Sequence, residues 1–220
     1  MSDSPTFRIP ALFNGPPDSA NGGITCGMLA AHLDAPVVQV TLRQPPPLET
    51  DLRVEQGRLY VGQVLLAEAV PGELDVTAPP AVGLARAEAA ATSYGGLVAH
   101  PFPTCFVCGT LRSDGLGLAA GPVADGLVAA VWTPRESTAL MVWAALDCPG
   151  GWSADLPGRP LVLGRMTCRI DDLPEVGVPY VVQGWHVRSE GRKVLTGTAL
   201  YDGTGRVLAA AGATWITITT

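Results

Sequence analysis

The chain has 220 residues, enough for one large domain or two small ones, and either arrangement can bury a substantial core. Hydrophobic residues make up 47% of the chain and charged residues 15%, which excludes a disordered protein, because disorder needs low hydrophobicity and high charge. The net charge is −6 and Lys and Arg form no long cluster, which argues against nucleic-acid binding.

Two features of the sequence bear on its location in the cell. Met1–Pro5 contains no basic segment followed by an apolar stretch, so we expect no signal peptide. The longest apolar runs, such as Gly126–Trp132, are far shorter than the roughly 20 residues that a membrane-spanning helix needs. We therefore expect a soluble cytoplasmic protein without a membrane span.

The first half of the chain begins with a loop rich in Pro and Gly, and a helix is predicted directly after it. The loop is Asn14–Gly23, and the apolar residues of Ile24–Leu33 follow helical spacing. Pro36 cannot continue a helix and marks its end. The Ala-rich stretch Ala81–Ala91 predicts a helix that connects the two halves. Strands are predicted over Val37–Leu42, Asp51–Glu55 and Leu59–Val70.

The second half follows a seam near Ser93–Pro103. A helix is predicted over Ser137–Leu146, ending at Asp147–Gly151. Turn signals at Ser189–Gly191 and Asp202–Gly205 separate the later strands, since Gly in such clusters is typical of hairpins. Strands are predicted over Gly126–Trp132, Pro160–Ile170, Tyr180–Ser189, Lys193–Tyr201 and Val207–Ile218.

Each half is thus predicted to contain one helix followed by several long antiparallel strands. A helix covered by a curved antiparallel sheet is an α+β layer architecture. We divide the chain into residues 1–95 and residues 96–220, and two such halves can join their sheets edge to edge, which removes exposed edges. An irregular β-sandwich with a few helices is the alternative.

The chain contains five cysteines, and their odd number argues against a disulfide framework and fits a reducing compartment. Cys105 and Cys108 form a Cys-x-x-Cys pair, but a structural zinc ion needs four ligands and no second pair exists. We interpret both as buried thiols in the first strand of the second half. The carboxylate of Asp147 next to Cys148 would raise the pKa of that thiol, which argues against a nucleophile there.

Three segments resemble the hotdog superfamily of acyl-thioester proteins. Cys105–Leu118 is similar to the opening segment of many small thioesterase-like hotdog proteins, and Ser19–Ala31 to the Gly-Gly turn that leads into the central helix. Met141–Asp147 resembles the helix of a second half that ends in Asp. The order of these segments is similar to the double-hotdog acyl-CoA thioesterases of the thioesterase II type. The resemblance implies a double hotdog, with two halves each built from a central helix wrapped by a curved antiparallel sheet.

The resemblance also implies roles for particular residues. Asp147 would position or deprotonate a water molecule, and burial would raise its pKa toward a useful value. The backbone N–H groups of Gly22 and Gly23, at the start of a helix, would polarise the thioester carbonyl, and Asn21 would donate one more hydrogen bond. Trp143 would line the core or an acyl channel. The alternative is structural: Asp147 caps a turn, and Asn-Gly-Gly is an ordinary turn without a ligand.

Two further positions of the family pattern differ here. The family's catalytic Gln aligns near Ala213, and its Ser or Thr aligns near Val162, with Thr167 close by. We expect an acyl-CoA or acyl-carrier thioester hydrolase, with two alternatives: a non-catalytic acyl-thioester-binding protein, and a hotdog hydratase, which needs an Asp and His pair. We expect no metal and no other cofactor, and a monomer or a homodimer. The phosphates of CoA would meet scattered arginines among Arg112, Arg165 and Arg169.

Overall fold

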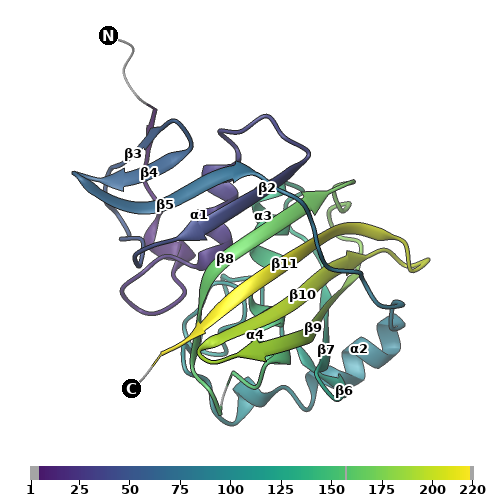
Figure 1. Cartoon of the computed structure of the whole chain (residues 1–220). Helices are drawn as coiled ribbons and strands as arrows, with labels where there is room; N and C mark the ends of the chain where they lie inside the picture. The colour runs from purple at the N-terminus through teal and green to yellow at the C-terminus, as the bar shows by residue number, and fades with distance from the viewer. Residues whose placement is uncertain (1–4, 157, 219–220) are drawn as a thin grey trace.

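The computed structural model describes residues 5–156 and 158–218, and its centre is a single antiparallel sheet of 11 strands (Figure 1). Buried and half-buried residues alternate along strands such as β2 (Val37–Leu42), as expected where one face of a sheet is more deeply covered than the other. In spatial order the strands are β1 (Thr6–Phe7), β3 (Leu52–Glu55), β4 (Arg58–Val61), β5 (Val64–Pro71), β2 (Val37–Leu42), β8 (Leu161–Ile170), β11 (Val207–Thr217), β10 (Lys193–Tyr201), β9 (Tyr180–Glu190), β7 (Leu127–Trp132) and β6 (Gly121–Ala124).

The pairing of β2 with β8 makes the sheet continuous. The two strands are antiparallel, from Val37 opposite Arg169 to Thr41 opposite Arg165. All strands formed by the first 71 residues lie on one side of this pairing, and all strands formed after residue 120 lie on the other. The pairing therefore joins two parts of the chain that are far apart in sequence.

Three helices cover one face of the sheet, and they form the main core with it (Figure 1). They are α1 (Gly22–Ala30), α3 (Ala139–Ala145) and α4 (Cys148–Ser153). Helix α1 packs directly on α3. The contact is so close that a Cβ added at Gly27 would lie only 2.9 Å from the Trp143 Cβ atom. Fully buried residues of this core include Ile24, Leu29, Leu146, Leu161, Met166 and Leu200.

The opposite face carries a smaller core under residues 72–83 and helix α2 (Leu84–Ala91). In Figure 1 the segment after β5 runs across this face to α2. The Tyr201 hydroxyl donates a hydrogen bond of 2.7 Å to the Pro79 carbonyl, and the Val82 N–H donates one of 2.5 Å to Gln183 Oε1. These bonds hold the segment on the sheet. The buried residues of this core are Ala87, Ala129, Val181, Ala199, Tyr201 and Ala210.

We expect Tyr201→Phe to lower the free energy of unfolding by about 1–3 kcal/mol, because the Pro79 carbonyl loses its donor. Tyr201 is 1% exposed and Pro79 is half-buried, so most of this hydrogen bond is shielded from water. Urea unfolding of the full chain measures the change. Tyr60→Phe is the matched control, because Tyr60 is partly exposed and its hydroxyl makes no hydrogen bond among the described residues. Equal losses for both variants would contradict the assigned role.

Most predicted elements are present, with shifted ends. The strands predicted over Val37–Leu42 and Lys193–Tyr201 have those bounds, whereas Leu59–Val70 is two strands with a turn at Gly62, whose φ is +56°. The helix predicted from Ile24 begins two residues earlier, at Gly22. Among the described residues, no helix is both long and apolar enough to cross a membrane.

The second half differs from the prediction in two places. The helix predicted over Ser137–Leu146 ends before Asp147 as expected, but a further helix, α4, follows at Cys148, because Pro149 in the first turn of a helix has no N–H to lose. Position 150 of that helix favours Gly because a Cβ there would lie 2.7 Å from Thr196 Oγ1. Cys105–Gly109 is not a strand but a compact turn, closed by the bond from the Gly109 N–H to the Cys105 carbonyl, 2.8 Å long.

Candidate functional site

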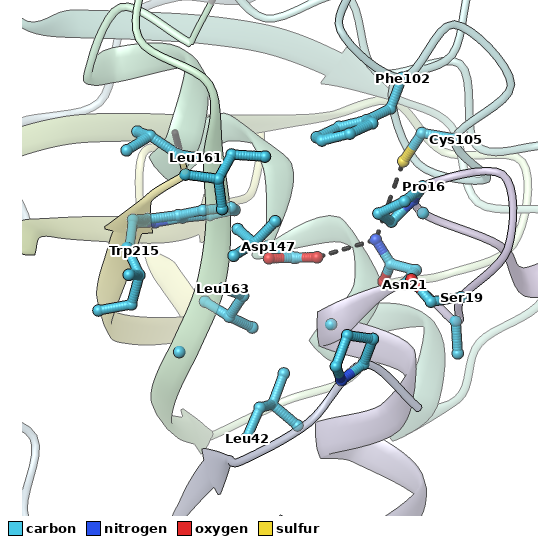
Figure 2. A pocket seen from close by; sticks show the side chains of 18 of the residues that line it. Pro16, Ser19, Asn21, Leu42, Phe102, Cys105, Asp147, Leu161, Leu163 and Trp215 are labelled. Atoms are coloured by element: carbon cyan, nitrogen blue, oxygen red, sulfur yellow. Dashed lines mark hydrogen bonds between the residues drawn. The ribbon is translucent and has the colours of Figure 1, made fainter. Parts of the chain in front are cut away.

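The helical face of the sheet encloses a cavity of about 360 Å³ between the start of α1, the start of α4 and strands β8 and β11 (Figure 2). Its walls are mostly apolar, and polar side chains gather at one end. Figure 2 shows Asp147 in the centre, with Asn21 and Cys105 on one side and Leu161 and Trp215 on the other. The apolar wall consists of Leu42, Phe102, Leu156, Leu161, Val162, Leu163, Trp215, Ile216 and Ile218.

Asp147 occupies the junction between α3 and α4, where it precedes the first residue of α4. Its side chain is buried, with 2% of the residue exposed. Its Oδ2 atom accepts hydrogen bonds from Asn21 Nδ2 at 2.8 Å and from the Gly23 N–H at 3.0 Å. Its Oδ1 atom has no partner among the described residues, although a buried carboxylate oxygen normally has one. One oxygen is thus fixed, and the other is available to a molecule in the cavity.

Asn21 is oriented by its position before helix α1. Its Oδ1 atom accepts a hydrogen bond of 2.9 Å from the Ile24 N–H, which is the normal capping contact at a helix start. Because Oδ1 is engaged in this way, the Nδ2 group must point away from the helix, and it reaches Asp147. The cap therefore fixes which atom of the amide faces the carboxylate.

The two glycines that follow have different surroundings. A Cβ at Gly23 would lie 2.6 Å from the Trp143 carbonyl oxygen and 2.7 Å from the Asp147 Cβ, so only Gly fits where α1 meets α3. The Gly23 N–H is already bonded to Asp147. The Gly22 N–H makes no hydrogen bond among the described residues, and Gly22 lines the cavity. Only the Gly22 amide is therefore available to a ligand.

Burial is the main cause of the titration behaviour of Asp147. Removal from water raises the pKa of the carboxyl to about 7, an effect that a charge on Cys105 strengthens. The hydrogen bonds from the Gly23 N–H and from Asn21 act in the opposite direction, because they stabilise the carboxylate. The result is a group that can gain or lose a proton near neutral pH, as a general base or acid must.

Three thiols lie at the same end of the cavity, although they come from distant parts of the sequence. Cys105, Cys108 and Cys148 are all buried, and their sulfur atoms lie within 4.8 Å of one another. Asn21 Nδ2 lies 3.9 Å from the sulfur atoms of both Cys105 and Cys148. Spacing in the sequence reveals the Cys-x-x-Cys pair but not Cys148, which the fold places beside it.

Trp143 does not share the cavity with Asp147. It lies on α3 against α1, beside a second cavity lined by Met28, Leu140 and Ile170. Thr167 points to the opposite face of the sheet, where its methyl group would lie 3.3 Å from a Cβ at Gly72. Neither side chain contacts the carboxylate.

The arginines at the cavity differ from those expected. Arg112, Arg165 and Arg169 are bonded to Asp114, Thr41 and Asp171, and none of the three lines the cavity. Arg43 and Arg192 line it instead. The sequence contains no signal for this choice, because Arg43 follows β2 and Arg192 lies in the distant turn between β9 and β10.

Neither a protein-family model nor any curated protein sequence matches the chain. Solved structures do match. A proposed thioesterase from Novosphingobium aromaticivorans superposes with a TM-score of 0.65 at 14% identity, over 97% of this chain and 95% of the other. A proposed thioesterase II from Thermobifida fusca gives a TM-score of 0.64 at 13% identity, over 97% and 92% of the two chains. A hotdog-fold protein of unknown function from Alicyclobacillus acidocaldarius gives 0.62 at 10% identity, over 98% and 93%. The predicted hotdog-type α+β fold is therefore confirmed.

Proposed function

We propose that this chain, which has the hotdog fold found in these thioesterase-like proteins, is a double-hotdog protein that binds an acyl-CoA or acyl-carrier thioester and hydrolyses it. The observation that carries the proposal is the state of Asp147. Its Oδ2 atom is held by Asn21 and the Gly23 N–H, and its Oδ1 atom is buried and unpartnered beside an apolar cavity. A carboxylate in that state is suited to take a proton from a water molecule.

The division into two hotdog halves is part of the proposal. Helix α1 with the strands before residue 72 would form one half, and helix α3 with the strands after residue 120 the other, with the boundary near residue 95. Two observations support it: the sheet joins the two sets of strands through the single pairing of β2 with β8, and α1 packs on α3. The proposed active site then lies between the halves, since Asn21 and Asp147 come from different ones.

In the proposed reaction, the acyl group lies in the apolar part of the cavity and the thioester carbonyl lies beside Asp147. The carboxylate removes a proton from water as the water oxygen bonds to the carbonyl carbon. The free Gly22 N–H donates to the developing oxyanion, a contact that strengthens as charge forms. The carbon–sulfur bond then breaks, and the departing thiolate takes the proton from Asp147. Asn21 holds the carboxylate in place of the Gln of the family pattern.

The lining of the cavity suggests a class of substrate. Its volume lies at the lower end of the range of small-molecule sites, and Leu161, Leu163 and Trp215 offer an apolar wall suited to a hydrocarbon or aromatic acyl group. Among the described residues, Arg43 and Arg192 are the cationic residues that line the cavity. Arg43 is paired with Glu68 and Arg192 donates to the Thr217 carbonyl, so the phosphates of CoA or of a carrier's prosthetic group would share these guanidinium groups with the contacts already present.

We would test the proposal by measuring the release of free thiol from a panel of acyl-CoAs, from short to long chains and including aromatic acids. Turnover above an enzyme-free control on any member supports hydrolysis, and the preferred acyl group describes the cavity. The second candidate function is non-catalytic binding, which the apolar residues Ala213 and Val162 at the aligned catalytic positions favour. Thermal stabilisation by the same ligands without turnover would favour that function. The absence of both turnover and thermal stabilisation would contradict hydrolysis and binding alike.

A further inference from the structure

The three thiols beside the cavity come from two distant parts of the chain. Cys105 and Cys108 belong to the turn over residues 105–109, and Cys148 is the first residue of α4. Each is 7% exposed or less, and all three line the cavity. The other two cysteines, Cys26 and Cys168, are buried elsewhere and do not belong to the group. Three of the five thiols are thus gathered at one point of the cavity wall.

The spacing of the sulfur atoms matches that of ligands around one metal ion. Cys105 Sγ and Cys148 Sγ lie 3.7 Å apart. Ligands at a zinc–sulfur distance of about 2.3 Å in tetrahedral geometry are about 3.8 Å from one another. The third sulfur lies within 4.8 Å of both, so small side-chain movements complete the arrangement. The cysteines are not joined by disulfide bonds.

The turn that carries Cys105 and Cys108 is rigid. A Cβ at Gly109 would lie 2.5 Å from the Cys105 carbonyl oxygen, so the close turn after the pair requires Gly. The Cys108 carbonyl accepts hydrogen bonds from Tyr94 and from His100, 2.9 and 3.0 Å long. The other ring nitrogen of His100 accepts from the Phe102 N–H, so His100 supports the turn and has no nitrogen left to bind a metal ion. These bonds hold the backbone that carries the two thiols.

The thiols also face a hydrogen-bond donor that can stabilise negative charge on sulfur. The Asn21 amide group faces Cys105 and Cys148 from the cavity side, with its Nδ2 atom 3.9 Å from both sulfur atoms. Thiolates are the form in which cysteines bind metals, and metal binding releases the thiol protons to solvent.

We propose that Cys105, Cys108 and Cys148 bind one thiophilic cation, Zn²⁺ or Cu⁺, with a coordination position left open toward the cavity. Both ions accept thiolate ligands in three-sulfur surroundings, and hard ions such as Mg²⁺ and Ca²⁺ do not. Binding is not a redox step, because the thiols lose protons and the ion keeps its charge. The proposal does not depend on thioester hydrolysis, since its evidence is the position of the sulfur atoms.

We would test the site with the reduced full-length protein, using Co²⁺ as a coloured substitute for Zn²⁺. We expect one equivalent of Co²⁺ to produce a sulfur-to-cobalt charge-transfer band and the strong visible bands of a tetrahedral complex. Zn²⁺ should then remove both. A parallel titration with Cu⁺, in competition with a chromophoric Cu⁺ chelator, identifies the preferred ion, and tight one-to-one binding of either ion supports the site.

Variants locate the site and control for folding. Cys108→Ser and Cys148→Ser should each abolish the charge-transfer band at one equivalent, whereas Cys26→Ser and Cys168→Ser, which remove equally buried thiols, should keep it. Circular dichroism of each variant shows whether it folds, and titration of the wild-type protein gives a result even where a variant does not. The proposal would be overturned if the wild-type protein gave neither a charge-transfer band with Co²⁺ nor tight one-to-one binding of Cu⁺, or if the binding survived Cys148→Ser. Loss of the band in Cys168→Ser, when that variant is folded, would also overturn it.

Discussion

Asp147→Asn should lower the rate of thioester hydrolysis by about 10²–10⁴-fold, the usual effect of removing a general base, and should change ligand affinity only a few fold. The amide oxygen of Asn can still accept the hydrogen bonds from Asn21 and the Gly23 N–H, so the position of the side chain is retained. What is lost is the ability to take a proton from water. The measurement is thiol release on the preferred acyl-CoA, together with thermal stabilisation by a non-hydrolysable analogue.

Asp125→Asn is the matched control, because Asp125 is exposed in the turn between β6 and β7. It removes the same charge far from the cavity and should keep full activity. Asp147→Ala extends the series by removing the hydrogen bonds as well, and it should also abolish hydrolysis. If Asp147→Asn keeps its activity, the carboxylate is not the base, and Asp147 has the structural role of joining α3 to the start of α1.

The second large effect is expected from Gly23→Ala, which should lower the free energy of unfolding by about 1–3 kcal/mol, the usual cost of overpacking. The added methyl group would lie 2.6 Å from the Trp143 carbonyl oxygen, within α3, and 2.7 Å from the Asp147 Cβ, at the junction of α3 and α4. To make room, α1 must move away from α3. That movement would lengthen the bond from the Gly23 N–H to Asp147, so hydrolysis should fall together with stability.

Urea unfolding and thiol release, measured on the same preparations, check this expectation. Gly203→Ala is the control, because a Cβ there has no heavy atom within 4 Å. It should leave both stability and activity within the experimental error. A Gly23→Ala protein as stable and active as the wild type would mean that the contact between α1 and α3 is looser than the structure describes, and that Asp147 is held by Asn21 alone.

The parts of the fold that local sequence determines were predicted well. Lys193–Tyr201 has apolar residues and β-branched residues between two strong turn signals, and it is a strand with those bounds. The Asp147–Gly151 segment does not indicate helix α4, because Pro and two Gly residues normally end a helix. Here Pro149 lies in a first turn, and packing against Thr196 selects Gly at position 150. Tertiary contacts, which local patterns do not contain, decide such a case.

The candidate site was predicted in part for the same reason. Asn21, Gly22 and Asp147 were singled out by resemblance, and the structure brings them to one cavity. Local sequence does not reveal which glycine is bonded. In the structure the Gly23 N–H donates to Asp147, and the Gly22 N–H is left as the available donor. Local sequence also cannot place Cys148 beside the Cys105 turn, because their approach depends on how α4 lies on the sheet.

The distance in sequence between Asn21 and Asp147 has a consequence for how the protein is made. The two residues are 126 positions apart, and ribosomes add about 5–20 residues each second, so Asn21 is added to the chain roughly 6–25 s before its partner. During that interval β2 lacks β8, its neighbour in the finished sheet, and one edge of the strand offers unpaired backbone groups to any other chain. A newly made chain should therefore be most prone to aggregation before residue 170 has emerged, and it acquires the complete cavity only late in its synthesis.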